Sequence, residues 1–202
     1  YGKDRHYHSH KTELCSERGY RLIHLWEDDW NDRKEIEVDF IKQLVGRSDS
    51  NVIYARKCDV QYIDKSDAKI FLAENHIQGS CGFTQAIGLI YNNEIVTVTT
   101  FTRRGDTYEL TRHATSKRVI GALGKTVKFF GKDCYTFCDL SRYSGDSYLK
   151  AGFVTSDHLN PDYKYIVNGK REHKFLWRRD SIKSKRPDVY DEDSSERKKK
   201  KK

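Results

Sequence analysis

Two apolar runs separated by three polar residues constrain the fold of this chain more than any other feature. The runs cover residues 86–91 and 95–101, and Asn92-Asn93-Glu94 stands between them. Runs of this length that are rich in β-branched residues favour strands, and asparagines tolerate the left-handed conformations of a tight turn. The sequence therefore predicts a β-hairpin at the centre of the chain, and a hairpin needs further strands or helices to be stable.

Weaker patterns around this hairpin predict an α+β domain over residues 52–180. Further strands are predicted at 52–55, through Val60 and Tyr62, at 107–113, at 134–140, and in a second hairpin of 163–167 and 172–177 around Asn168-Gly169. Helices are predicted at 64–74, 119–130 and 147–151. This order favours a mixed, mainly antiparallel sheet flanked by helices.

The first 46 residues carry a different pattern. A polar, helix-compatible run reaches Gly19, a residue type that commonly ends helices. Residues 20–26 are nearly continuously apolar, which is typical of a strand buried on both faces, and 35–45 has the spacing of an amphipathic helix. Three acids at 27–29 follow the apolar run. They are placed to hold a metal at the end of a buried strand, but they equally suit the first turn of a helix.

Composition predicts two domains and a basic partner surface. The polar stretch 47–51 is the predicted linker between residues 1–46 and 52–180, and the charged segment 181–202 is predicted to be disordered. The net charge is +8, and residues 51–187 hold 23 basic against 14 acidic side chains. This excess favours a polyanion such as nucleic acid as the partner, the alternative being a basic domain without one.

The cysteines and the apolar runs exclude two other classes of protein. The five cysteines are scattered, and no Cys or His pair with zinc spacing accompanies Cys134 and Cys138, so we expect free thiols. No signal peptide or long apolar run is present, and membrane insertion is therefore not expected.

A resemblance to a nuclease family rests on two runs, Tyr7-His8-x-x-Lys11-Thr12-Glu13-Leu14-Cys15 and residues 19–30. They resemble the final third of the nuclease domain of phage homing endonucleases of the EDxHD type, which are relatives of the very-short-patch-repair endonuclease. The resemblance implies a restriction-endonuclease-like core, of which this chain holds the C-terminal part, with the remaining metal ligands upstream of Tyr1. It also implies Mg²⁺-dependent cleavage of double-stranded DNA, with His8, Lys11 and Glu27 as catalytic residues and Glu27 as a metal ligand.

A second resemblance covers residues 52–180. The order of the predicted elements is similar to that of a GNAT acyltransferase domain. Two local motifs match that family, Arg118-x-x-Gly121-Ala122-x-Gly124 before a helix and the run Ser147-Tyr148-Leu149-Lys150-Ala151-Gly152-Phe153. In the GNAT fold the first motif holds the pyrophosphate of coenzyme A and the tyrosine of the second can act as an acid. Leu123 stands where the family has a small residue, so coenzyme A is not the expected ligand.

Eleven residues of the basic region are predicted to contact DNA, because they lie mostly at strand ends or loops from which long side chains reach phosphates. They are Arg56, Lys57, Arg103, Arg104, Arg112, Arg118, Lys125, Arg142, Tyr143, Arg178 and Arg179. Tyr143 is a candidate for stacking on a base. Arg103 and Arg104 are the strongest pair, because a hairpin tip has no evident structural need for two charges.

The sequence thus predicts a DNA-binding protein of the phage homing-endonuclease type that works in the cytoplasm of a bacterial host. We expect this chain to be incomplete as an active nuclease. Two alternatives stay open. One is a GNAT-type acyl or group transferase that uses coenzyme A, and the other is a DNA-binding remnant without activity.

Overall fold

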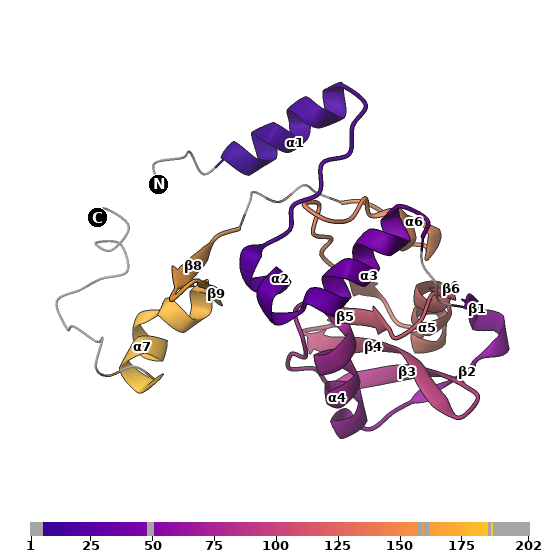
Figure 1. Cartoon of the computed structure of the whole chain (residues 1–202). Helices are drawn as coiled ribbons and strands as arrows, with labels where there is room; N and C mark the ends of the chain where they lie inside the picture. Colours follow the sequence, from indigo (N-terminus) through magenta and orange to yellow (C-terminus); the bar gives the residue numbers. More distant parts are fainter. Residues whose placement is uncertain (1–5, 48–50, 157–158, 160–161, 186, 188–202) are drawn as a thin grey trace. The chain divides into compact units, whose positions relative to one another are not determined.

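The computed structural model of this chain describes residues 6–47, 51–156, 159, 162–185 and 187. The chain divides into two compact units, residues 12–157 and residues 1–11 with 158–202, which are described separately below. Within the described ranges the fold is α+β, with seven α-helices, one curled five-stranded sheet and two small two-stranded sheets (Figure 1). The predicted linker at 47–51 falls inside the larger unit, and its residues 48–50 lie outside the described ranges.

The five-stranded sheet is built on the predicted hairpin, which is confirmed. Its strands are β2 (Asp59–Tyr62), β3 (Gln85–Tyr91), β4 (Glu94–Arg104), β5 (Thr107–Thr115) and β7 (Cys134–Tyr135). They follow one another in the order β2-β3-β4-β5-β7, and every neighbouring pair is antiparallel except β5 and β7. Asn92 and Asn93 both have positive φ in the β3–β4 turn, as a two-residue hairpin loop requires.

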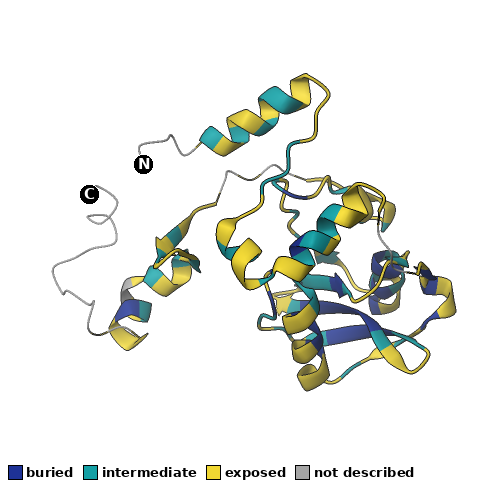
Figure 2. Ribbon diagram, viewed as in Figure 1, coloured by how far each residue is buried: buried dark blue, intermediate teal, exposed yellow. Residues whose placement is uncertain are grey.

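Two helices cover opposite faces of this sheet. Helix α4 (Lys65–Asn75) buries Phe71 and Leu72 against a cluster that includes Val98. Helix α5 (Ala122–Phe130) packs on the other face, where the rings of Phe130 and Phe101 stack with centroids 3.7 Å apart. Figure 2 shows the buried residues concentrated in the sheet strands and in the helix faces that meet them. Each helix therefore has its own core, and the sheet separates the two.

A short parallel pair of strands lies next to α5. It consists of β1 (Ile53–Tyr54), which leads into the 3₁₀ turn η1 (Ala55–Lys57), and β6 (Val119–Ile120). The predicted helix 119–130 thus begins only at Ala122, and the predicted strand 134–140 ends at Tyr135. The short helix α6 (Asp146–Lys150) completes this part of the unit.

The N-terminal segment differs from its prediction in one respect. Helix α1 (Tyr7–Glu17) ends before Gly19, whose φ of +76° confirms the predicted stop. Residues 20–26, however, are not a strand, and Tyr20 is 71% exposed. The prediction of a buried strand is wrong because no described strand lies beside this segment, so its apolar side chains are not enclosed by a sheet.

The acids at 27–29 form the first turn of helix α2 (Glu27–Asp32), which is the structural alternative given above. Helix α3 (Lys34–Leu44) follows and buries Glu37 completely. The Glu37 carboxylate accepts two hydrogen bonds from the guanidinium of Arg142, at 2.7 and 2.9 Å, and Arg142 is 4% exposed. The charge of Arg142, which the sequence assigned to DNA, is therefore buried and paired inside the protein.

The segment that carries Arg142 is held by further contacts from the N-terminal region. The guanidinium of Arg21 donates to the Arg142 carbonyl at 2.8 Å, and the His24 amide donates to the Ser141 carbonyl at 3.0 Å. The ring of Phe40 packs edge-on against Tyr143, with centroids 5.5 Å apart. Helix α3 and residues 21–24 thus pack with the loop around residue 142 within the larger unit.

The smaller unit contains the second predicted hairpin, which is also confirmed. It pairs β8 (Lys164–Val167) with β9 (Lys170–His173) around Asn168 and Gly169, both with positive φ. Its second strand is shorter than predicted, because a 3₁₀ turn η2 (Lys174–Trp177) follows and leads to helix α7 (Arg179–Lys185). Helix α7 covers the start of the segment predicted to be disordered, and 188–202 lies outside the described residues. Among the described helices, none combines the length and apolar character needed to cross a membrane.

The Glu37–Arg142 pair generates a prediction about stability. Replacing Glu37 with Ala leaves an unpaired cation in the interior, and this should lower the free energy of unfolding by about 3–5 kcal/mol. Replacing both residues with methionine removes both charges and should restore much of the loss. Urea denaturation measures both effects, and Lys117→Ala, which breaks an exposed pair with Glu94, is the control. A Glu37→Ala variant as stable as the control would contradict this account.

Candidate nucleic-acid interface

The N-terminal end of α5 brings together several of the predicted basic residues. Gly121 precedes the helix in a left-handed conformation, with φ of +81° and ψ of 8°, which turns the chain from β6 into α5. Lys125, one turn into the helix, reaches across to η1. Its ammonium donates to the carbonyl of Ala55 at 3.0 Å and also to that of Cys58. The cation is therefore held at a defined position beside the start of the helix.

An open pocket of about 370 Å³ lies at this end of α5. Its lining includes Tyr54, Arg56, Ile120, Lys125 and Lys128, together with the backbone around Gly121 and Gly124. Arg56 and Lys128 are exposed, and the Arg56 guanidinium lies over the Tyr54 ring, 5.1 Å from its centroid. Among the described residues that line it, three are cations and none is a carboxylate. The pocket is therefore suited to an anion.

Two further predicted residues lie close to this pocket in the chain. Lys57 is exposed in η1, and exposed Arg118 immediately precedes β6, where its carbonyl accepts from the Ile53 amide at 2.9 Å. Leu123 is buried in the core, so it does not obstruct the pocket. Sequence reasoning missed Lys128. The signal was its position one turn after Lys125, which places both side chains on one side of α5.

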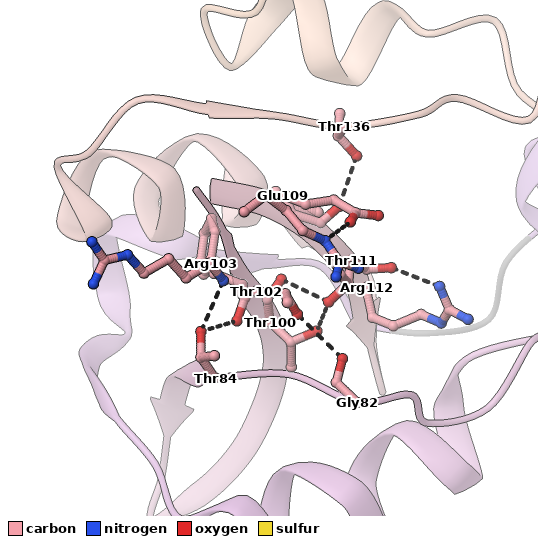
Figure 3. A network of polar contacts seen from close by, with 12 residues as sticks. Gly82, Thr84, Thr100, Thr102, Arg103, Glu109, Thr111, Arg112 and Thr136 are labelled. Atoms are coloured by element: carbon pink, nitrogen blue, oxygen red, sulfur yellow. Dashed lines mark hydrogen bonds and ion pairs between the residues drawn. The ribbon is translucent and has the colours of Figure 1, made fainter. Parts of the chain in front are cut away.

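Other predicted DNA contacts have structural partners. Arg104 pairs with Glu109 at 2.8 Å, and Arg103 Nε donates to the Gly105 carbonyl at 3.1 Å, so both arginines of the hairpin tip support the turn. The Arg103 side chain nevertheless points away from the threonine network that joins β4 to its neighbours (Figure 3). Arg112 donates to the carbonyls of Gly79 and Thr111. These contacts give all three arginines a structural role, whereas the sequence alone assigned their charges to DNA binding.

The remaining predicted DNA contacts, Tyr143, Arg178 and Arg179, do not line the pocket at α5. Tyr143 is 43% exposed, but one edge of its ring is engaged by Phe40. In the smaller unit, Arg178 lies over the Phe175 ring, 3.8 Å from its centroid. Arg179 begins α7, and its side chain lies outside the described set. The α5 end is therefore the place where the predicted basic residues are best grouped.

The residues predicted for catalysis are not brought into one described site. His8 and Lys11 are exposed one turn apart on α1 and belong to the smaller unit, whereas exposed Glu27 belongs to the larger one. Among the described residues, no group of three His, Cys, Asp or Glu side chains is arranged to hold a metal ion. The three acids at 27–29 form the first turn of α2, and Glu27 as a metal ligand stays a prediction.

A buried polar row runs beneath α5. Thr99 Oγ1 is 2.8 Å from His113 Nδ1 and donates to Thr126 Oγ1 at 2.9 Å, and Thr126 in turn donates to the Ala122 carbonyl. Burial lowers the pKa of His113 to about 4. His76, beyond α4, has a pKa lowered to about 3, first by burial and then by the nearby charge of Arg112. Both imidazoles are neutral at physiological pH.

Comparison with known proteins leaves this interface to be interpreted from its own chemistry. No protein-family model matches the sequence, and a search of curated proteins finds no match either.

The two histidines predict the acid sensitivity of the fold. In the unfolded chain a histidine binds a proton below about pH 6.5, whereas the folded imidazoles stay neutral until about pH 4 and about pH 3. The folded state therefore has its full stability above pH 6.5, where the histidines are neutral in both states. As the pH falls towards 4 and 3, protonation of the two histidines in the unfolded chain lowers the free energy of unfolding. Between these limits each histidine should contribute a slope of up to about 1.4 kcal/mol per pH unit.

The measurement is urea unfolding across this pH range. His113→Gln should give a flatter dependence of the unfolding free energy on pH than the unmodified chain. His10→Gln, at an exposed position on α1, is the matched control and should leave the slope unchanged. Equal slopes for His113→Gln and the unmodified protein would exclude a buried neutral His113.

Proposed function

We propose that this chain binds double-stranded DNA through the basic surface at the N-terminal end of α5. The observation that carries the proposal is the pocket itself, which is lined by Arg56, by Lys125 in the first half of α5 and by Lys128 in its last turn. Backbone N–H groups at a helix N-terminus favour phosphate, and the three cations add to that preference. The nearby exposed charges of Lys57 and Arg118 extend the positive surface beyond the pocket.

An open surface with separated cations supports a polymeric phosphate ligand. Most protein–DNA hydrogen bonds go to the phosphate and sugar, and they position the protein without reading sequence. The Tyr54 ring, 43% exposed and lying below Arg56, adds an apolar surface at the same place. Residues 51–187 also carry a net positive charge, which attracts the negatively charged phosphates of DNA.

This role agrees with the place of such a domain in the homing endonucleases that residues 7–30 resemble. The proposal assigns DNA contact to the described residues and derives no cleavage step from them. A hydrolytic metal site needs carboxylates that share one cation, and Glu27 stands in the first turn of an exposed helix. In a protein of that type, this chain would contribute the binding of the substrate.

The proposal predicts salt-dependent binding of duplex DNA by the full chain. Replacing Arg56 and Lys128 with glutamine removes two phosphate contacts. The affinity should then fall by about tenfold or more, and the slope of log K against log salt should become shallower by about 1.8. Fluorescence anisotropy of a labelled duplex at several salt concentrations measures both quantities.

A matched control is available on the opposite face of the sheet. Lys65 and Lys69 are exposed on α4, so changing both to glutamine removes the same charge away from α5. If this variant loses as much affinity and slope as the Arg56/Lys128 variant, only net charge matters and the proposed surface is wrong.

A second candidate, transfer of an acyl group from coenzyme A, is favoured by the strand order. The order β2-β3-β4-β5-β7, with β5 parallel to β7, agrees with the order of the GNAT fold, and Gly121 stands at the start of the helix that follows β5 and β6. Tyr148 of the second motif packs edge-on against Phe153, and burial raises the pKa of its hydroxyl. Burial therefore keeps this hydroxyl protonated at neutral pH, which is the form that a general acid must have.

Calorimetry with acetyl-coenzyme A separates the two candidates. We expect no saturable heat up to roughly millimolar ligand, because two of the three Lys125 donors are already engaged by backbone carbonyls. Micromolar binding that is lost in Arg118→Ala would instead assign the pocket to coenzyme A.

A further inference from the structure

The β8–β9 hairpin of the smaller unit has two chemically different faces. Residues directly opposite each other in an antiparallel pair lie on the same face. The register pairs Lys164 with His173 and Ile166 with Arg171, and these four residues form one face, called here the open face. The register pairs Tyr165 with Glu172 and Val167 with Lys170 on the other face.

The second face is covered by the turn that follows the hairpin. The Trp177 ring of η2 lies against Tyr165, with centroids 5.3 Å apart, and its Nε1 donates to the Glu172 carboxylate at 2.8 Å. The hairpin therefore obtains its packing from Trp177 on that face. On the open face the same turn contacts His173, because the Phe175 amide donates to His173 Nδ1 at 3.3 Å and the two rings lie 4.7 Å apart. The Lys164 and Ile166 side chains of this face are exposed.

The open face combines exposed cationic and apolar groups. Ile166 is 65% exposed at its centre, and Lys164 and His173 are exposed on the paired strands beside it. A large aliphatic side chain at this exposure contributes little to the hairpin's own packing, because burial is the source of its stabilisation. Basic side chains around it point to a ligand that offers both acceptors and apolar groups.

We propose that the open face enters the major groove of duplex DNA, an inference that rests on the DNA binding proposed above. The major groove is about 12 Å wide and admits a two-stranded ribbon, whose strands lie about 4.8 Å apart. Lys164 presents donors of the kind that recognise guanine N7 and O6. Ile166 presents a surface of the kind that contacts the methyl group of thymine.

One positive group that follows the hairpin, Arg178, is placed to contact the DNA backbone. Lys174, by contrast, is paired with Asp162 at 2.7 Å and lies 5.5 Å from the Tyr163 ring. The guanidinium of Arg178 is stacked on Phe175 and keeps its planar edge for phosphate. The ribbon thus supplies groups for reading bases, and the turn after it supplies groups for positioning.

The test compares two lysines of the same hairpin in the full chain. Lys164→Ala removes a donor from the open face, and Lys170→Ala removes the same charge from the opposite face. Binding is measured on duplexes recovered by the unmodified protein from a random-sequence pool. Lys164→Ala and Ile166→Ala should each weaken binding by about tenfold, whereas Lys170→Ala should change it by less than about twofold. Circular dichroism and thermal melting establish that each variant is folded.

Guanine N7 methylation gives a readout that a phosphate contact would not move. Methylated duplexes should bind the unmodified protein several-fold more weakly than unmethylated ones, and Lys164→Ala should reduce this difference. Equal binding by the Lys164 and Lys170 variants, or no effect of methylation on the unmodified protein, overturns the groove contact.

The failure of this inference is distinguishable from failure of the proposed function. If the Arg56/Lys128 variant weakens binding while all hairpin variants bind normally, the α5 surface stands and the ribbon is excluded. Absence of duplex binding by the unmodified chain overturns both.

Discussion

The larger unit depends on an ion pair that water does not reach. Glu37 and Arg142 are 105 residues apart in sequence, and each would be strongly unfavourable in the interior without the other. Their bidentate contact therefore requires α3 and the loop around Arg142 to arrive together. Arg21 and His24 donate to the backbone of the same loop, and the guanidinium also lies over the Phe40 ring. Residues 21–44, which contribute no strand to the sheet, are thereby packed into the larger unit.

The local sequence pattern was sufficient to predict the hairpins, whose tight turns depend on neighbouring residues. Asn92-Asn93 and Asn168-Gly169 take the left-handed conformations that close hairpins, and Leu123 points inward because its neighbours at helical spacing are apolar. The failures arise where a distant partner decides the outcome. Residues 20–26 have the composition of a buried strand, but composition does not reveal whether a neighbouring strand exists. The sequence likewise could not show that Arg142 meets Glu37.

The candidate site was predicted only in part for the same reason. Arg56 and Lys125 were recognised as basic residues near turns, but their shared pocket depends on β1 pairing with β6, which joins residues more than sixty positions apart. Arg104 was assigned to DNA although Glu109, five residues away across the turn, neutralises it. A cross-strand pair of opposite charges is visible in the sequence once the turn is placed, so this ion pair was predictable.

Lys125 has a consequence for the thermodynamics of binding. A surface lysine normally loses side-chain conformational freedom when it grips a ligand, and that loss reduces affinity. Here the carbonyls of Ala55 and Cys58 already restrict the side chain before any ligand arrives, while the ammonium keeps one of its three protons. The entropic cost of ordering this cation is borne during folding. Association at this pocket should therefore show a smaller entropic penalty from Lys125 than from its unrestrained neighbour Lys128.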